Sequence, residues 1–299
     1  MLSLVRHSDH KVADSFWELF GAILRYSSHA AHRQFGRWTP GIVGCICFDR
    51  SLFAANPQQP RLRRKGLRTD VAYWFLTPLV TKSISQIGLA IILIALYRRN
   101  IADIQRILIA PDTLLAKQPL PLQAIEMVVV GDFISYWVHR WFHRSRMWSF
   151  HAVHHSSGSL DWLSAVRVHP VNEWLSRWIQ VSVLVVLGFN PMAVAAYLPF
   201  LTFYAIFIHA NVSWGFGKFG WLIASPKFHR WHHTSEDEGL DKNFAVLFPW
   251  IDILFGTYYM PADTLPRRFG VKDDNVPESF WGQLLYPFNH AGSIRQRQL

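Results

Sequence analysis

The stretch "HRWFH" at residues 139–143 directly follows an apolar segment, "AIEMVVVGDFISYWV", at residues 124–138. Residues four apart on a helix lie on the same face, so both histidines point the same way where the apolar helix ends. Lys, Arg or Trp alone would anchor the end of such a helix, whereas two imidazoles indicate a binding role. Whether they bind a ligand depends on the histidines elsewhere in the chain.

The composition favours a membrane protein. Of the 299 residues, 51% are hydrophobic and 17% are charged, compared with about a quarter charged in a typical soluble domain. Apolar segments occupy residues 71–97, 121–138, 174–189 and 190–209. The first exceeds the roughly 20 residues that cross a bilayer, although Pro78 and Lys82 interrupt it and leave open one kinked span or a re-entrant pair. "GFNP" at 188–191 predicts a tight turn between the last two segments.

Residues 1–70 form a basic N-terminal interfacial region, and residues 71–299 form the predicted membrane-embedded domain. The basic region ends in "RLRRKGLR" at 61–68, directly before the first apolar segment. With a net charge of +10 for the chain, such a run is compatible with nucleic-acid binding. Beside an apolar span, it instead favours anionic lipid on the cytoplasmic side, and we expect no nucleic-acid partner.

Ten of the fifteen histidines lie between residues 139 and 233. Eight of them form three motifs, "HRWFH" at 139–143, "HAVHH" at 151–155 and "HRWHH" at 229–233. Helical spacing points the imidazoles of each motif toward one spot. Two apolar crossings separate the first two motifs from the third, so all three are expected on the same side of the membrane. Burying so many imidazoles without partners is costly, and metal binding would satisfy their lone pairs.

Eight imidazoles exceed the four ligands of a structural zinc site, so the pattern predicts two metal ions. Cys45 and Cys47 are the only cysteines, which argues against a thiolate site and a disulfide framework. "HRWFH" also lacks the glutamate of the H-E-x-x-H hydrolases. Imidazole suits iron, zinc, copper and nickel alike, so the residues alone leave the metal open.

Six motifs follow one another along residues 130–260: D-x6-HR-x2-H, H-x2-HH, "RVHPVNE", "HAN", "SPKFHRWHH" and "DKNFAVLFPWIDILFGTYY". Together they resemble the fatty acid hydroxylase / sterol desaturase superfamily. "KNFAV" departs from the Asn-aromatic-Gly pattern expected there. The resemblance implies an all-α, polytopic membrane helix bundle with a cytoplasmic histidine-rich helical cap that holds a di-metal site.

The resemblance also implies site residues. The eight motif histidines carry over as metal ligands, and two further histidines stand at additional ligand positions of the family. The predicted ligands are His139, His143, His151, His154, His155, His169, His209, His229, His232 and His233. Side chains expected to support these imidazoles are Asp132, Glu173, Asn211, Asp241 and Asn243.

Asp132 lies two helical turns before His139, where its carboxylate would accept the free N–H of a ligand imidazole. A charge at a membrane boundary is the alternative for Asp132. Structural roles are also the alternative for the other residues: Glu173 as a charge at a helix start, and Asp241 and Asn243 as polar residues in a solvated loop.

The predicted function is hydroxylation of a fatty acyl, sterol or polar-lipid C–H bond by two iron ions and O2, with zinc able to replace iron on purification. Desaturation is the alternative, and a metal-dependent membrane hydrolase is a less favoured one. The sequence contains no haem-binding His-Pro-Gly-Gly, cysteine cluster or flavin fingerprint. We therefore expect a separate ferredoxin or cytochrome as electron donor, and a multi-pass location in a bacterial inner membrane.

Overall fold

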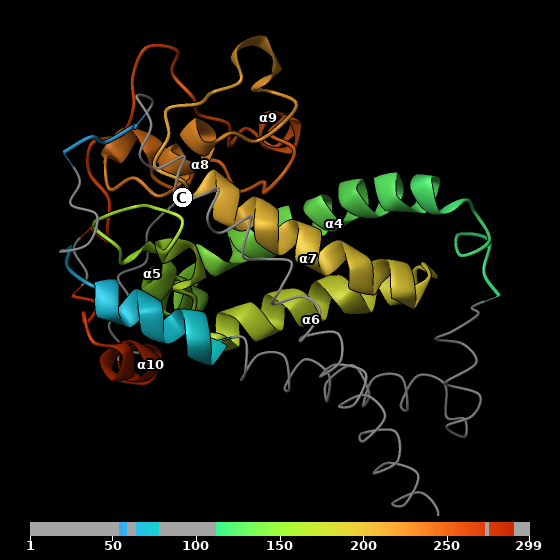
Figure 1. The fold of residues 1–299 in the computed structure, drawn as a ribbon, viewed down its shortest axis with the longest axis horizontal. Coiled ribbons are helices and arrows are strands. Elements are labelled where there is room, and N and C mark those ends of the chain that lie inside the picture. The colour runs from blue at the N-terminus through green and yellow to red at the C-terminus, as the bar shows by residue number, and fades with distance from the viewer. Residues whose placement is uncertain (1–53, 59–63, 78–111, 273–274, 290–299) are drawn as a thin grey trace, which may run out of the picture.

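The computed structural model describes residues 54–58, 64–77, 112–272 and 275–289, and this part of the chain is helical (Figure 1). Most of the basic N-terminal region and residues 78–97 of the first apolar segment lie outside the described residues. Within the described ranges there is no strand, and the only β-type pairs are the isolated bridges Ala54–Val212 and Thr234–Phe269. The predicted all-α architecture is confirmed for these residues.

Three long helices form the body of the described fold: α4 (Leu120–Phe142), α6 (Pro170–Val186) and α7 (Pro191–Ile208). They correspond to three of the predicted apolar segments, and the predicted turn separates α6 from α7. None of the helices that the structure describes combines the length and the hydrophobicity needed to cross a membrane.

The three helices pack closely through small and polar residues as well as apolar ones. Gln180 on α6 donates its amide N–H to the Gly131 carbonyl (3.1 Å) and to Ser135 Oγ (2.9 Å) on α4. Gly131 faces α7, where an added Cβ would overlap with Tyr197 Oη. Met127, Leu184 and Tyr197 are buried in the core between the helices. A glycine at position 131 therefore sets how closely α7 approaches α4.

Shorter helices gather at the end of the bundle where α4 ends (Figure 1). They are α5 (Trp148–His155), α8 (Pro226–His232), α9 (Trp250–Leu254), α10 (Phe280–Asn289), a helix at 67–77 and single 3-10 turns at Ser145–Met147, Ser164–Val166, Gly217–Phe219 and Asp237–Gly239. Ser225 caps α8, because its Oγ accepts the backbone N–H of Phe228 (3.2 Å). Pro226 then occupies the first helical position, where its missing N–H costs nothing. This start places the three histidines of "HRWHH" within one turn of helix.

Candidate metal centre

Nine of the ten predicted ligands come together in two groups at this end of the bundle. Within each group, one nitrogen from every imidazole lies within 4.8 Å of the others. The five-histidine group consists of His139, His143, His151, His155 and His232, and the four-histidine group consists of His154, His209, His229 and His233. The imidazoles come from α4, α5 and α8 and from the residues that directly follow α4, α7 and α8.

The two groups adjoin because two short helices contribute to both. Consecutive helical side chains point about 100° apart, so neighbours in sequence can serve different sites. His154 and His155 on α5 go to different groups, as do His232 and His233 at the end of α8. The rings of His155 and His233, one from each group, stack with centroids 4.3 Å apart.

Backbone carbonyls orient several of the imidazoles. Nδ1 of His139 lies 2.7 Å from the Phe244 carbonyl, and Nδ1 of His154 lies 3.0 Å from the Arg167 carbonyl. His209 contacts the carbonyl of Ala205 in the same way, at 2.5 Å. Since a carbonyl oxygen only accepts hydrogen bonds, the proton of each neutral imidazole lies on Nδ1. Nε2 then carries the lone pair and faces the group.

Side chains orient two more imidazoles. Nδ1 of His143 lies 3.0 Å from Asp241 Oδ1, one of the predicted supporting side chains. Nδ1 of His151 lies 2.7 Å from Asn172 Oδ1. Asn172 was not among the predicted site residues. Its only signal in the sequence is its place inside "RVHPVNE", between His169 and Glu173.

The inward-facing nitrogen atoms fit a cation. Nε2 of His139 lies 3.0 Å from Nε2 of His151, and Nε2 of His209 lies 3.2 Å from Nε2 of His154. Lone pairs this close repel each other, unless a cation binds both. Two nitrogen atoms that each bond to one ion at about 2.1 Å lie roughly as far from each other as the two Nε2 atoms in each of these pairs. In addition, the buried Nε2 atoms of His155 and His232 have no hydrogen-bond partner among the described residues. Each group therefore has the donor set of a metal site.

Burial keeps the imidazoles neutral. Burial lowers the pKa of His154 to about 4. It also lowers the pKa of His155 and of His233 well below the ordinary value, and neighbouring imidazoles lower both further. Neutral imidazole is the form that binds metals, so the site is ready for ions at neutral pH.

The structure places His169 outside both groups, in contrast to the ligand role predicted for it. Its Nδ1 accepts the backbone N–H of Val171 (3.1 Å) and thereby caps α6. Its Nε2 donates to the carbonyl of Leu284 on α10 (3.1 Å). Both nitrogen atoms are thus used within the fold, and His169 is a helix cap here.

Asp132 also differs from its prediction, because its carboxylate does not accept from a ligand imidazole. Oδ1 accepts the backbone N–H groups of Val246 and Leu247 (both 3.0 Å), and Oδ2 accepts that of Phe248 (2.7 Å). Asp132 therefore fixes α4 to the loop that carries the Phe244 carbonyl. Its effect on His139 is indirect.

The remaining three predicted supporting residues connect parts of the fold. Glu173 forms an ion pair with Arg177 one turn along α6. Asn211 exchanges two hydrogen bonds with the backbone of Asn56, at 3.0 and 3.2 Å. Asn243 is fully buried and bonds to the backbone of Phe228 and Tyr259. These contacts explain why polar residues stand at the three positions.

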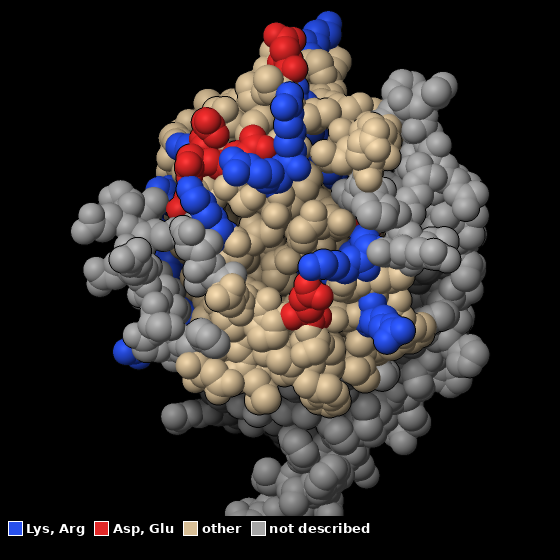
Figure 2. All heavy atoms as spheres, turned by 90° about the vertical axis from the view of Figure 1, so that its left-hand side faces the viewer, with Lys and Arg blue, Asp and Glu red and all other residues tan. Residues whose placement is uncertain are grey.

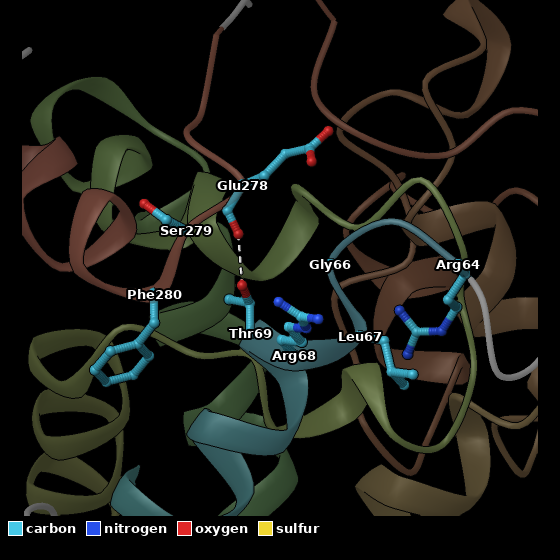
Figure 3. A pocket seen from close by; sticks show the side chains of 8 residues that line it. All are labelled: Arg64, Gly66, Leu67, Arg68, Thr69, Glu278, Ser279 and Phe280. Atoms are coloured by element: carbon cyan, nitrogen blue, oxygen red, sulfur yellow. Dashed lines mark hydrogen bonds between the residues drawn. The ribbon is translucent and has the colours of Figure 1, made fainter.

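Two pockets flank this region. A small one leads from the surface to the five-histidine group and is lined by His143, Trp148, His155, His232, Thr234, Leu240, Asp241, Gly270, Val271 and Lys272. A larger one of about 580 Å³ lies at the start of the helix at 67–77 (Figure 3). Arg64 on its wall is buried and pairs with Asp70 and Asp161. Because no histidine of either group lines the larger pocket, its size does not make it the reactive site.

The surface at this end carries charges of both signs. Figure 2 shows basic and acidic side chains interspersed, with uncharged surface between them. Lys272, which lines the small pocket, pairs with exposed Asp237, and exposed Lys65 lies 3.7 Å from Glu278. The described surface is therefore mixed in charge around the site.

Comparison with known proteins connects this geometry to a family. A family model described as fatty acid hydroxylase matches residues 124–257, a segment that contains every histidine of both groups. An ornithine lipid hydroxylase of Rhizobium tropici is 28% identical over 176 residues, which is 58% of this chain and 53% of that protein. Human alkylglycerol monooxygenase is 36% identical over 129 residues, 42% of this chain and 28% of that protein.

A very-long-chain aldehyde decarbonylase of Oryza sativa subsp. japonica is 27% identical over 160 residues, 49% of this chain and 25% of that protein. The matches thus span about half the length of the bacterial relative and less than a third of the other two. No solved structure matches this chain significantly.

Proposed function

The chain belongs to the fatty acid hydroxylase / sterol desaturase superfamily, and from this premise we propose that it is a di-iron oxygenase that hydroxylates a C–H bond of a lipid. The observation that carries the proposal is the convergence of nine histidines into two adjoining groups whose Nε2 atoms face inward. When bound, two ferrous ions would supply the reduction of O2 that such chemistry needs. Zinc can replace iron on purification, because imidazole sites bind it more tightly.

The protein's own contribution is ligand geometry. The five-histidine group would hold one ion and the four-histidine group the other. Oxygen acceptors at Nδ1 keep the imidazoles in the correct tautomer, and burial excludes water from reactive species. Hydrogen removal from carbon needs no general base from the protein, which agrees with a site built from neutral imidazoles.

We place the enzyme in a membrane as a multi-pass protein, with the metal centre on the cytoplasmic face of a bacterial inner membrane. An apolar stripe on α4 supports contact with lipid. Its residues, spaced three or four apart on one helix face, are Leu122, Ile125, Val129, Phe133 and Trp137, and all are exposed. The stripe runs along most of α4, so lipid chains lying against this face of the helix would contact it.

A polar lipid is the substrate class we favour among fatty acyl, sterol and polar-lipid substrates. The names of two relatives refer to ornithine lipids and alkylglycerols, which are polar lipids rather than sterols. The name of the rice relative refers to a different reaction, on aldehydes. Because the names of the relatives cover more than one reaction, desaturation of a lipid remains the second candidate, and a metal-dependent membrane hydrolase is the third.

Lipid profiling of cells with and without the full chain tests the proposal. Hydroxylation predicts a lipid that gains one oxygen atom, and only when O2 is present. A loss of two hydrogen atoms would instead assign desaturation, and product formation without O2 would assign hydrolysis. His154→Ala and His232→Ala, one from each group, should abolish the product and reduce bound iron.

We also propose that a separate ferredoxin or cytochrome supplies the electrons. Three histidines of the five-histidine group, His143, His155 and His232, line the small pocket, which supports electron entry at that place. Purified enzyme should consume O2 with added reduced ferredoxin or cytochrome and lipid. Turnover without any added electron donor would contradict a separate partner.

A further inference from the structure

One short segment orients most of the five-histidine group. It comprises residues 241–248, between the 3-10 turn Asp237–Gly239 and α9. Three of its residues accept from Nδ1 of three ligands: Asp241 Oδ1 from His143 (3.0 Å), the Lys242 carbonyl from His232 (2.8 Å) and the Phe244 carbonyl from His139 (2.7 Å). We call this segment the orienting loop.

The four-histidine group takes its described acceptors from other parts of the chain. His154 uses the carbonyl of Arg167, which follows a 3-10 turn, and His209 uses the carbonyl of Ala205 on α7. Through its described contacts with Nδ1 atoms, the orienting loop therefore acts on the five-histidine group, whereas other elements orient His154 and His209. Damage to the loop should affect the two metal sites unequally.

The loop has a backbone conformation that it would not adopt readily by itself. Asp241 and Asn243 have φ values of 55° and 60°. This left-handed region is unfavourable for residues with a side chain, although Asp and Asn tolerate it better than most. External contacts must therefore hold the loop in shape.

Asn243 supplies one such anchor. Its amide N–H groups donate to the carbonyls of Phe228 (2.9 Å) and Tyr259 (2.6 Å), and its Oδ1 accepts the Tyr259 N–H (2.7 Å). The backbone N–H of Asn243 donates to the Thr257 carbonyl at 2.9 Å. The residue is fully buried, so these bonds are protected from water.

Two buried carboxylates supply the other anchors by accepting five successive backbone N–H groups. Asp252 accepts those of Phe244 (2.7 Å) and Ala245 (2.9 Å), and also the hydroxyl of Thr257 (2.7 Å). Asp132 accepts those of residues 246–248. Phe244 is therefore held at its N–H by Asp252 while its carbonyl holds His139.

We infer that the orienting loop sets the ligand geometry of one metal ion, and that Asn243 and Asp252 are positioning residues for the five-histidine group. This inference rests on the proposed metal centre. In Asp252→Asn, the new amide N–H group would face a backbone N–H, so the Phe244 carbonyl would shift and His139 would lose its fixed orientation. Loss of such supporting hydrogen bonds typically weakens metal affinity by about 10 to 100-fold.

Titration of the metal-free full chain with Co²⁺ tests the inference, with binding followed by visible absorption and calorimetry. Unaltered protein should bind two Co²⁺ ions. Asp252→Asn should bind one ion with unchanged affinity and the other about 10 to 100-fold more weakly. The absorption bands of only one ion should change. Asp237→Asn, at an exposed residue paired with Lys272, is the matched control and should bind both ions normally.

Asn243→Gly provides a second, independent variant. Glycine tolerates the left-handed conformation, so this change removes the amide anchors without adding backbone strain. Asn243→Gly should also weaken the binding of one Co²⁺ ion and leave the other unchanged. It tests the inference by itself if Asp252→Asn does not fold. Equal weakening of both sites, or normal binding of both ions by a folded variant, would overturn the inference. If the unaltered chain fails to bind two Co²⁺ ions, the proposed metal centre itself is wrong.

Discussion

A histidine binds a metal through the ring nitrogen that lacks a proton. In this centre, an oxygen atom that accepts from Nδ1 keeps the proton on Nδ1 for most of the imidazoles. Carbonyl oxygens do this for His139, His154 and His232, whereas the carboxylate of Asp241 does it for His143. A carboxylate also makes the imidazole a stronger donor to the metal. The five-histidine group thus receives a negative charge through one of its ligands.

Removal of that carboxylate should weaken one metal site. Asp241→Ala takes away the acceptor of His143, so we expect the affinity for one ion to fall by about 10 to 100-fold. Competition with a chelator measures this for both ions. Glu238→Ala, at an exposed acidic residue nearby, is the control and should leave both affinities intact. Equal affinities in Asp241→Ala and the control would count against the contact.

Replacement of His169 distinguishes a role as the cap of α6 from a role as a metal ligand. His169→Ala should keep full metal content, because both nitrogen atoms of His169 bond within the fold. It should lower the free energy of unfolding by about 1 kcal/mol, since α6 loses its cap. Metal analysis and thermal unfolding check both parts. Loss of one ion would show that His169 is a ligand after all.

At the scale of helices, α5 and α8 allow two sites to form side by side. Each helix is short, and consecutive histidines at its C-terminal end, 154 and 155 in α5 and 232 and 233 at the end of α8, go to different groups. If the two histidines were farther apart along a longer helix, each intervening residue would separate them by a further 1.5 Å along its axis. The long helices α4, α6 and α7 supply the frame on which these short ones rest.

Close packing of that frame depends on Gly131. Gly131→Ala adds a methyl group that overlaps with Tyr197 on α7, so we expect destabilisation of about 1 to 3 kcal/mol. Tyr197→Phe removes the hydroxyl oxygen nearest that methyl group, and within the described ranges this oxygen has no hydrogen-bond partner. The double variant should therefore recover part of the loss. Chemical denaturation measures both, and an additive result would contradict the proposed clash.

The molecule as a whole buries many imidazoles in one place, which makes the metal-free protein sensitive to acid. Burial lowers the folded-state pKa of His154 to about 4, below the ordinary value of 6.5. A lowered pKa contributes stability above the unfolded value that is lost as the pH falls toward the folded value. We expect the unfolding temperature of metal-free protein to fall from pH 7 to pH 5. An unfolding temperature independent of pH over this range would contradict neutral, buried imidazoles.

The sequence determined the helical class, and its three motifs predicted eight of the nine histidines that converge in the structure. Helix formation and the spacing of i, i+3 and i+4 are local properties, so "HRWFH", "HAVHH" and "HRWHH" each indicated a shared face. The family resemblance added His209, which the structure brings into the four-histidine group. It also added His169, which the fold uses as a cap instead.

Only the tertiary structure decided how the ligands divide between two groups and what holds each imidazole. These contacts join residues far apart in the chain, such as His139 with Phe244 or Asp132 with residues 246–248. Many of the acceptors are backbone carbonyls, which every residue has, so side-chain identity carries no signal for them. Asp132 and Asn243 were recognised as important polar residues, but packing alone directed them to the loop rather than to an imidazole.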